Sequence, residues 1–189
     1  IKLQSLARNQ LMLPITALVI MLFINFLVIP GFFKISIQNG VLYGYTIDIL
    51  NRSCELIIMA VGMTLVVAAS RGTDISVGAV AAVTAAVVVR LLGSSYDSYA
   101  MSPALAIFIG LLAALVCGAF NGFLVANLNI QPMVATLILF TAGRGIAQLL
   151  SAREIDGVMA PGQILYVRME SFKYIGGFIP GCVIPTPVF

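Results

Sequence analysis

The sequence contains no histidine and no tryptophan, and charged residues make up only 9% of its 189 residues. Without histidine, a Ser-His-Asp triad, a Cys-His pair and a zinc site with imidazole ligands are all excluded. A soluble domain carries about 25% charged residues, so this chain has too little polar surface to cover a water-soluble globule. The absence of histidine therefore excludes imidazole-based enzymes, and the scarcity of charge predicts a membrane protein.

Cysteine and net charge are also low. The net charge of +3 is small and scattered among apolar runs, which argues against a nucleic-acid partner. The three cysteines, Cys54, Cys117 and Cys182, stand far apart and form no CxxC or similar ligand spacing. Cys117 lies in an apolar run, where a thiol behaves as a small hydrophobe. Cys54 and Cys182 flank such runs, so both a disulfide between them and two free thiols stay open.

Apolar residues form 61% of the chain and gather in runs of the length that crosses a bilayer. A spanning helix needs about 20 apolar residues, so the length allows about five spans. We therefore expect an all-α, polytopic helical membrane protein in which residues 1–189 form a single transmembrane domain. The expected spans are 11–29, 54–70, 75–92, 103–126 and 132–151, followed by an extracytoplasmic segment at 152–183 and the start of a further helix at 184–189.

A polar break near residues 70–76 separates two of these spans. The apolar stretch 56–69 is shorter than a normal span, and a mixed loop at 32–53 is expected to precede it. Two short apolar pieces on either side of a glycine-containing break predict a discontinuous helix or a tight helical hairpin.

The break has two interpretations. Asp74 is an N-cap residue type just before an apolar run, so its carboxylate or the Ser76 hydroxyl could satisfy free amides at the start of the next helix. Alternatively, the break shapes a translocation path or a gate, because irregular backbone at membrane depth is tolerated only where protein or water covers it. On this second interpretation Asp74, Ser76 and Gly78 are site residues.

The expected helix 103–126 carries a stripe of small residues. Gly110, Ala114, Gly118 and Gly122 recur every four residues and so share one face. Small residues let another helix approach closely within lipid. The stripe predicts a helix-packing seam, and a surface that lines a path for solute is the alternative.

The expected helix 132–151 carries a polar stripe. Thr141, Arg144 and Gln148 are spaced by three and four residues, which places them on one face. A charged side chain within a span is costly unless it faces the bundle interior, a cavity or the interface. These groups would suit a polyhydroxylated solute in a translocation path, but snorkelling of Arg144 to the interface explains it equally well.

The charged residues that flank the apolar runs indicate how the chain is oriented in the membrane and which segments are solvated loops. The leader, with Lys2 and Arg8, favours an N-terminus on the cytoplasmic side, although the basic residues of the later loops balance between the two sides. The mixed charges of residues 152–173 are typical of a solvated loop, which could also dock a soluble partner. The first residue is Ile rather than Met, which suggests that residues precede it.

Two blocks of sequence carry extended motifs. The first block reads AVGMTLVV at 60–67 and GTDISVGA at 72–79, and the second reads NGFLVA at 121–126, IQPMVATL at 130–137 and GRG at 143–145. The first block resembles the GMTLV and GGIDLSVGA strings, and the second the NGxLVA, PxxATL and RG strings, of the ribose-type sugar permeases of bacterial ABC importers. The blocks have the family's order and spacing and cover nearly the whole chain.

Within that family, IDILNR at 47–52 and AGRGIAQ at 142–148 look closest to the galactofuranose-type permeases. Three features depart from the family pattern. Arg71 stands where a glycine is usual, Thr73 stands where an isoleucine is usual, and the link 127–131 lacks the usual basic residue.

The resemblance implies a multi-pass protein of the bacterial inner membrane that forms half of a pathway for importing a monosaccharide. It implies three protein partners besides the lipid bilayer: a second permease copy, an extracytoplasmic sugar-binding protein and a cytoplasmic ABC ATPase. The chain itself would hold no cofactor, because the partner ATPase binds the ATP. Family members are nearly twice as long, so the resemblance also implies that this is the N-terminal part of a longer permease, unable to transport alone.

Two other classes are weighed against this one. An ion-coupled secondary transporter would also have broken helices, but it normally places an acidic residue within a span, and the apolar runs hold none away from their ends. A membrane-embedded enzyme would need a nucleophile with a base, or a carboxylate cluster, and no such set converges in the sequence.

Overall fold

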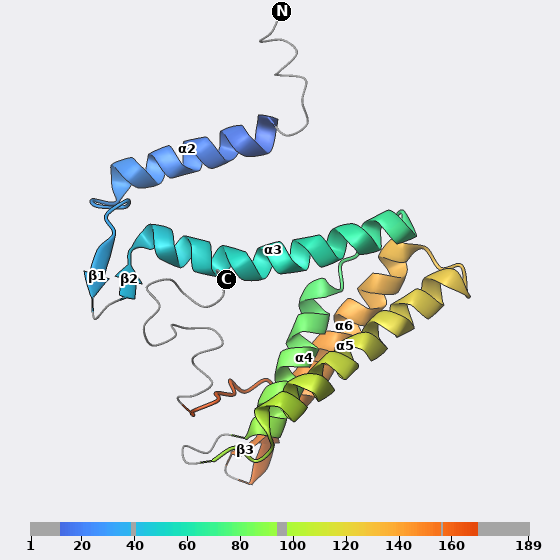
Figure 1. Cartoon of the computed structure of the whole chain (residues 1–189). Helices are drawn as coiled ribbons and strands as arrows, with labels where there is room; N and C mark the ends of the chain where they lie inside the picture. Colours follow the sequence, from blue (N-terminus) through green and yellow to red (C-terminus); the bar gives the residue numbers. More distant parts are fainter. Residues whose placement is uncertain (1–11, 39–40, 94–97, 156, 170–189) are drawn as a thin grey trace, which may run out of the picture. The chain divides into compact units, whose positions relative to one another are not determined.

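Five helices and two short hairpins make up the described part of the computed structural model, which comprises residues 12–38, 41–93, 98–155 and 157–169 (Figure 1). The expected leader, the end of the segment 152–183 and the further helix at 184–189 lie outside these residues, as does Cys182. The elements are α2 (Met12–Val28), β1 (Ser36–Gln38), β2 (Val41–Tyr43), α3 (Tyr45–Ser70), α4 (Val77–Leu92), α5 (Pro103–Ala126), α6 (Pro132–Leu150), β3 (Arg153–Ile155) and β4 (Val158–Ala160).

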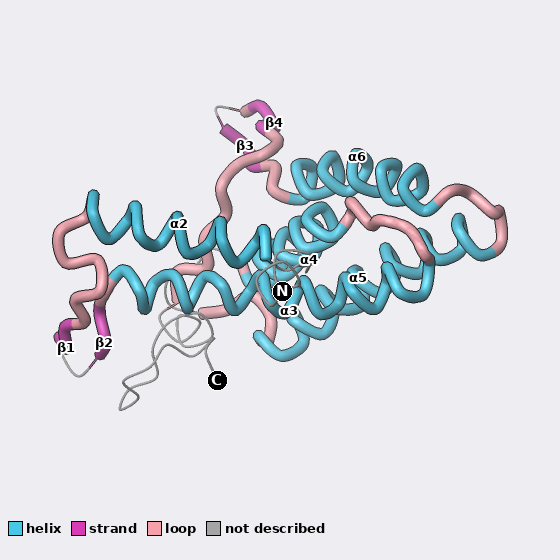
Figure 2. The backbone as a smooth tube through the Cα atoms, turned by 90° about the horizontal axis from the view of Figure 1, so that it is seen from above, coloured by secondary structure: helices cyan, strands magenta, loops and turns pink. Residues whose placement is uncertain are grey.

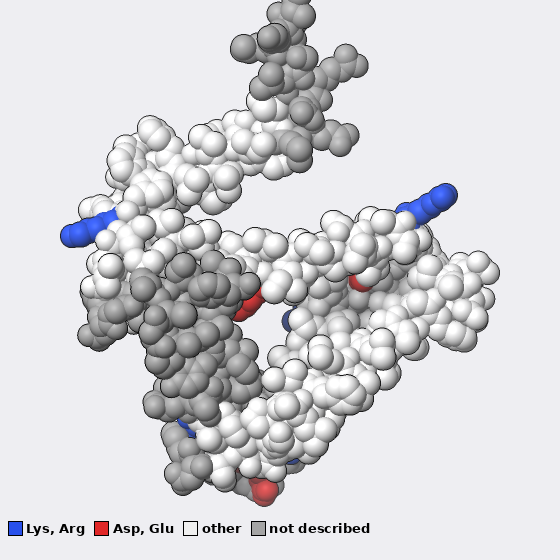
Figure 3. Space-filling view, in the orientation of Figure 1, with Lys and Arg blue, Asp and Glu red and all other residues white. Residues whose placement is uncertain are grey.

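Three of these helices, α3, α5 and α6, are long and apolar enough to cross a membrane, and α2 and α4 are shorter apolar helices. Few acidic or basic side chains interrupt the face shown in Figure 3. The predicted class of a helical membrane protein is thereby confirmed. The chain divides into two compact units with a boundary inside α3, after Cys54; the expectation of a single transmembrane domain stays a prediction.

In the first unit, the turn that precedes α3 fixes where that helix begins. Phe32 is 4% exposed; its ring packs edge-on against Phe33 and stacks on Tyr45, with centroids 4.9 and 6.3 Å apart. The hydroxyl of Thr46 donates to the Phe32 carbonyl at 3.4 Å. In the sequence between Phe32 and Tyr45, β1 and β2 form an antiparallel hairpin in which Ser36 pairs with Tyr43. These contacts close the turn just before the helix.

The helix α3 therefore begins at Tyr45, well before the apolar stretch 56–69. Residues 45–53, which were expected to belong to the loop 32–53, are helical. Residues 45–61 contain no Gly or Pro to interrupt the helix. Asp48 lies in the first turn, where a carboxylate opposes the helix dipole favourably. The side chains of Ser53 and Cys54 bond back to carbonyls one turn earlier, so they are satisfied within the helix.

In the second unit, α4 lies between α5 and α6 and is the shared element of a three-helix core (Figure 2). Small residues set the two contacts. A Cβ at Gly110 of α5 would clash with the Val88 side chain of α4, and a Cβ at Gly143 of α6 would lie 3.2 Å from Ala79 of α4. The core is completed by Val83, Ala106, Ala135 and Leu139, which are all buried.

The three core helices alternate in direction. At one end, the α3–α4 break meets the start of α6: the Ile75 amide donates to the Thr136 hydroxyl at 3.2 Å. At the other end, Arg90 of α4 donates from Nη1 to the carbonyl of Ala152, just past α6, at 3.2 Å. Residues 71–76 and the link 127–131 therefore share one end of the bundle (Figure 1), which is the arrangement that alternating membrane spans require.

Candidate functional site: a cavity at the helix break

The helix α3 stops at a residue in a strained backbone conformation. Arg71 has φ +52°, in the left-handed region that costs an L-residue roughly 1–2 kcal/mol. Its amide still donates to the Val67 carbonyl at 2.9 Å, so Arg71 occupies the position after the helix that glycine usually takes. Next to it, a Cβ on Gly72 would lie 2.6 Å from Cβ of Pro132. The backbone of the break thus rests directly on the start of α6.

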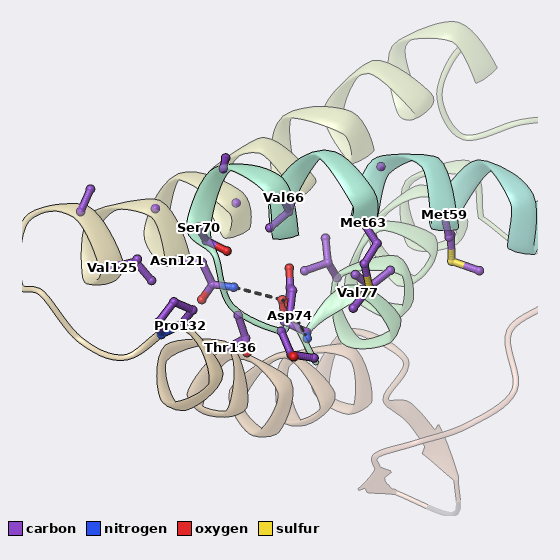
Figure 4. Close-up of a pocket in the computed structure, with 18 residues that line it drawn as sticks. Met59, Met63, Val66, Ser70, Asp74, Val77, Asn121, Val125, Pro132 and Thr136 are labelled. Carbon is purple, nitrogen blue, oxygen red and sulfur yellow. Dashed lines mark hydrogen bonds between the residues drawn. The ribbon is translucent and has the colours of Figure 1, made fainter. Parts of the chain in front are cut away.

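A chain of hydrogen bonds ties the break to α5. One carboxylate oxygen of Asp74, Oδ1, accepts from both the amide and the hydroxyl of Ser76, each at 2.7 Å. The Ser76 hydroxyl in turn accepts from Nδ2 of Asn121 in α5 at 3.0 Å, the dashed line in Figure 4. Ser76 is 2% exposed, so these bonds satisfy a hydroxyl that has no access to solvent.

Asp74 therefore forms an Asx turn just before α4, in which its carboxylate satisfies the amide of Ser76, the N-cap residue, and Ser76 makes no side-chain capping bond of its own. Among the described residues, no ion pair joins Asp74 to Arg71, and no partner is recorded for the second carboxylate oxygen. Thr136 makes the matching bond on the α6 side, accepting from Ile75 and donating to the Met133 carbonyl at 3.2 Å.

These polar groups lie at one end of a cavity of about 620 Å³. Its wall is mainly apolar, with side chains from α3, α4 and α5, and Figure 4 shows Met59, Met63 and Val66 of α3 on one side and Val125 of α5 on another. Polar atoms come from the break and from two neighbouring helices. The polar residues of the lining are Ser70, Thr73, Asp74, Ser76, Asn121 and Thr136.

One polar atom of this lining lacks a partner. Oδ1 of Asn121 is buried and makes no hydrogen bond with any part of the chain that the structure describes. A buried carbonyl oxygen without a donor costs about 1–3 kcal/mol unless a ligand or water supplies one. The second oxygen of Asp74 offers an acceptor for a hydroxyl donor beside an apolar wall, whereas Oδ1 of Asn121 has no exposed surface.

Only some of the residues predicted for the break and for the small-residue stripe line the cavity. Asp74 and Ser76 line the cavity, whereas Gly78 is exposed and does not. Gly118 and Gly122 also line the cavity, and a Cβ on either would meet only open space. In the described structure the stripe therefore serves two surfaces: its start at Gly110 contacts α4, and its end borders the cavity.

The remaining stripe residues lie elsewhere. Ala114 is half-buried and does not line the cavity. Thr141, Arg144 and Gln148 are exposed on α6, away from the face that contacts α4. Thr141 bonds back to the Leu137 carbonyl at 3.1 Å, and the Arg144 guanidinium lies 5.4 Å from the Phe140 ring centre. The structure does not bring this stripe to the break, and its role in a translocation path stays a prediction.

Asn121, Thr136 and Ser70 are not among the site residues predicted from the sequence. A signal for Asn121 was present, since it is the one amide within the apolar run 103–126, and polar groups inside membrane segments mark functional or structural contacts. Thr136 and Ser70 gave no such signal, because hydroxyls within a helix commonly bond to their own backbone.

In the described residues, no group of three or more His, Cys, Asp or Glu side chains could hold a metal ion. Cys54 and Cys117 are free thiols. The pairing of Cys54 with Cys182 involves a residue outside the described part. The cavity at the break is lined by hydrogen-bonding groups and apolar side chains.

Known proteins similar to this chain are membrane permeases. Residues 45–178 match a family described as the permease component of the branched-chain amino acid transport system. The galactofuranose transporter permease protein of Escherichia coli (strain K12) is 42% identical over 92% of this chain and 46% of its own length. The ribose import permease protein of Haemophilus influenzae is 32% identical over 92% of this chain and 47% of its own length.

The fructose import permease protein FruF of Bifidobacterium longum is 38% identical over 62% of this chain and 31% of its own length. The chain thus spans less than half the length of each of these relatives. No solved structure gives a significant match. The family description names a transport component rather than an enzyme. Because the match covers most of the chain, the protein belongs to this family of transport-system permease components and is a membrane protein.

Proposed function

We propose that this chain is part of a permease subunit of an ABC importer in a bacterial inner membrane, and that the substrate is a monosaccharide. The printed names of the relatives support a sugar, since they are transporters of galactofuranose, ribose and fructose. They favour this function over an ion-coupled secondary transporter. The protein partners proposed are a cytoplasmic ATPase, an extracytoplasmic binding protein and a second permease copy.

The observation that carries the proposal is the cavity at the break. A monosaccharide offers hydroxyl groups along its edge and C–H groups on its faces. The second carboxylate oxygen of Asp74 would accept from a hydroxyl, while the valine and methionine side chains of the wall would contact the C–H faces. The polar end is small, so a solute would be held weakly, as passage through a pathway requires.

The test is uptake in cells that carry the whole protein with its partners. We expect deletion of the gene to abolish uptake of one labelled sugar among ribose, galactose and fructose, and the wild-type gene to restore it. Asp74→Ala should lower uptake at least tenfold with the protein still inserted. The matched control is Glu154→Ala, which removes an exposed carboxylate of β3 outside the cavity.

Uptake at the parental rate in Asp74→Ala would remove the break from the transport mechanism. Uptake that needs an ion gradient, and that persists when ATP is depleted, would overturn the importer class itself. Co-purification of an ABC ATPase with the tagged protein, read by mass spectrometry, is the independent check on the partners.

A further inference from the structure

A second, smaller cavity of about 150 Å³ lies at the other end of the bundle from the break. Unlike the first cavity, it is lined by two arginine side chains. Its lining residues are Val89, Arg90, Gly93, Arg153, Leu165 and Tyr166. Neither the sugar pathway nor the bundle core uses these arginines, so the cavity requires its own explanation.

Both arginines line this one cavity. Arg90 lies in the last turn of α4, and its Nη1 donates to the carbonyl of Ala152 at 3.2 Å. Ala152 is 6% exposed, and Arg153 follows it directly as the first residue of β3. The bond that anchors Arg90 therefore also brings the second arginine to the cavity, and Figure 1 shows β3 beside this end of α4.

The charge of this pair is not balanced within the described chain. No Asp or Glu lines the cavity, and no ion pair of Arg90 or Arg153 is recorded among the residues that the structure describes. Two cations that share a small cavity repel each other, so the site favours an anion. Guanidinium groups bind phosphate oxygens through paired N–H donors, which makes phosphate the best-matched anion.

The position of the cavity favours a lipid as the source of that phosphate. Arg90 lies in the last turn of the apolar helix α4, which places the cavity near the level where membrane helices meet the headgroups. Val89 and Leu165 add apolar surface beside the arginines, and Tyr166 is 61% exposed next to them. Tyrosine is typical of this interface, where its ring contacts apolar groups and its hydroxyl faces water.

We propose that this cavity binds the headgroup phosphate of an anionic phospholipid. Because no acidic partner of the two arginines lies among the described residues, a lipid with a net negative charge should bind better than one whose choline group cancels the phosphate charge. The site is independent of the transported solute, so its failure would leave the importer proposal untouched.

The test is native mass spectrometry of the intact protein, purified in detergent with phosphatidylglycerol or phosphatidylcholine. We expect the wild type to retain phosphatidylglycerol in preference to phosphatidylcholine. Arg153→Gln should weaken retention roughly tenfold, which corresponds to about 1.4 kcal/mol. This variant removes no hydrogen bond to any residue that the structure describes, so we expect it to fold. Arg90→Gln, which also loses the bond to Ala152, should weaken retention further.

The matched control is Arg144→Gln, because Arg144 is an exposed arginine that does not line the cavity. Equal retention of phosphatidylglycerol by the wild type and both cavity variants would overturn the proposal. Equal retention of the two lipids by the wild type would overturn it as well. If millimolar inorganic phosphate displaces the lipid fully and binds in its place, the site takes free phosphate and the lipid assignment is wrong.

Discussion

Replacing Asp74 by Ala, and separately by Asn, tests how the break is held together. Asp74→Ala removes the acceptor of the Ser76 amide, and loss of such a hydrogen bond costs about 0.5–1.5 kcal/mol. It also strands the hydroxyl hydrogen of Ser76, a residue only 2% exposed, and an unsatisfied buried donor costs about 1–3 kcal/mol. Since the two effects share one side chain, we expect a combined loss of about 2–3 kcal/mol.

Asp74→Asn keeps a carbonyl oxygen that can occupy the position of Oδ1 and accept both bonds. Only the charge assistance is lost, so we expect a smaller loss, about 1 kcal/mol. The measurement is the free energy of unfolding from denaturing-detergent titration in mixed micelles, followed by circular dichroism. The exposed Glu154→Ala serves as the control and should stay within about 0.5 kcal/mol of the wild type.

Equal losses in the two Asp74 variants would refute the reasoning, because they would show that negative charge rather than the acceptor geometry holds the break. No loss in Asp74→Ala would show that the Ser76 amide and hydroxyl find other partners. In either case the hydrogen-bond chain from Asp74 through Ser76 to Asn121 would not be what fixes α4 against α5.

Three further predictions use the same unfolding measurement. Arg71→Gly should raise stability by about 0.5–1 kcal/mol, because glycine adopts φ +52° without strain; a loss would show that the arginine side chain makes a contact worth more than the strain. Gly72→Ala should lower stability by about 1–3 kcal/mol through its clash with Pro132, and an unchanged value would show that the break moves freely. Gly110→Ala should lower the stability of the protein by a similar amount, because the new Cβ would clash with the Val88 side chain. Its control in the same helix is Gly118→Ala, whose Cβ would meet open space, so stability should be unchanged or higher.

The helices follow from the sequence because apolar run length and proline position are local signals. Pro103 and Pro132 open α5 and α6 as the sequence predicts, since proline fits the first turn of a helix. The sequence does not predict the start of α3, because the mixed polarity of residues 32–53 indicates a loop. Only the absence of Gly and Pro in that stretch, and the turn built on Phe32, extend the helix back to Tyr45.

The site was partly predictable for a similar reason. Asp74 is recognisable because a carboxylate before an apolar run is a local capping signal. Its neighbours are not, because Asn121 and Thr136 lie far along the chain and reach the break only through the three-helix packing. The stripe of small residues was predicted as one surface. In the structure, Gly110 contacts Val88 of α4, whereas Gly118 and Gly122 border the cavity. This difference depends on where α4 begins, which the spacing of residues within α5 cannot reveal.

The stability of the break comes from its contacts with α5 and α6 rather than from burial of α3. No residue of α3 is buried within the described structure. By contrast, the break itself is joined to α6 by the Ile75–Thr136 bond and by the contact of Gly72 with Pro132. The two walls of the cavity are therefore unequal: the bundle wall is fixed by buried side chains, whereas the α3 wall is attached through one strained residue, Arg71. A substitution in the bundle wall should thus change stability, while one on the cavity face of α3, such as Met63→Leu, should leave stability unchanged.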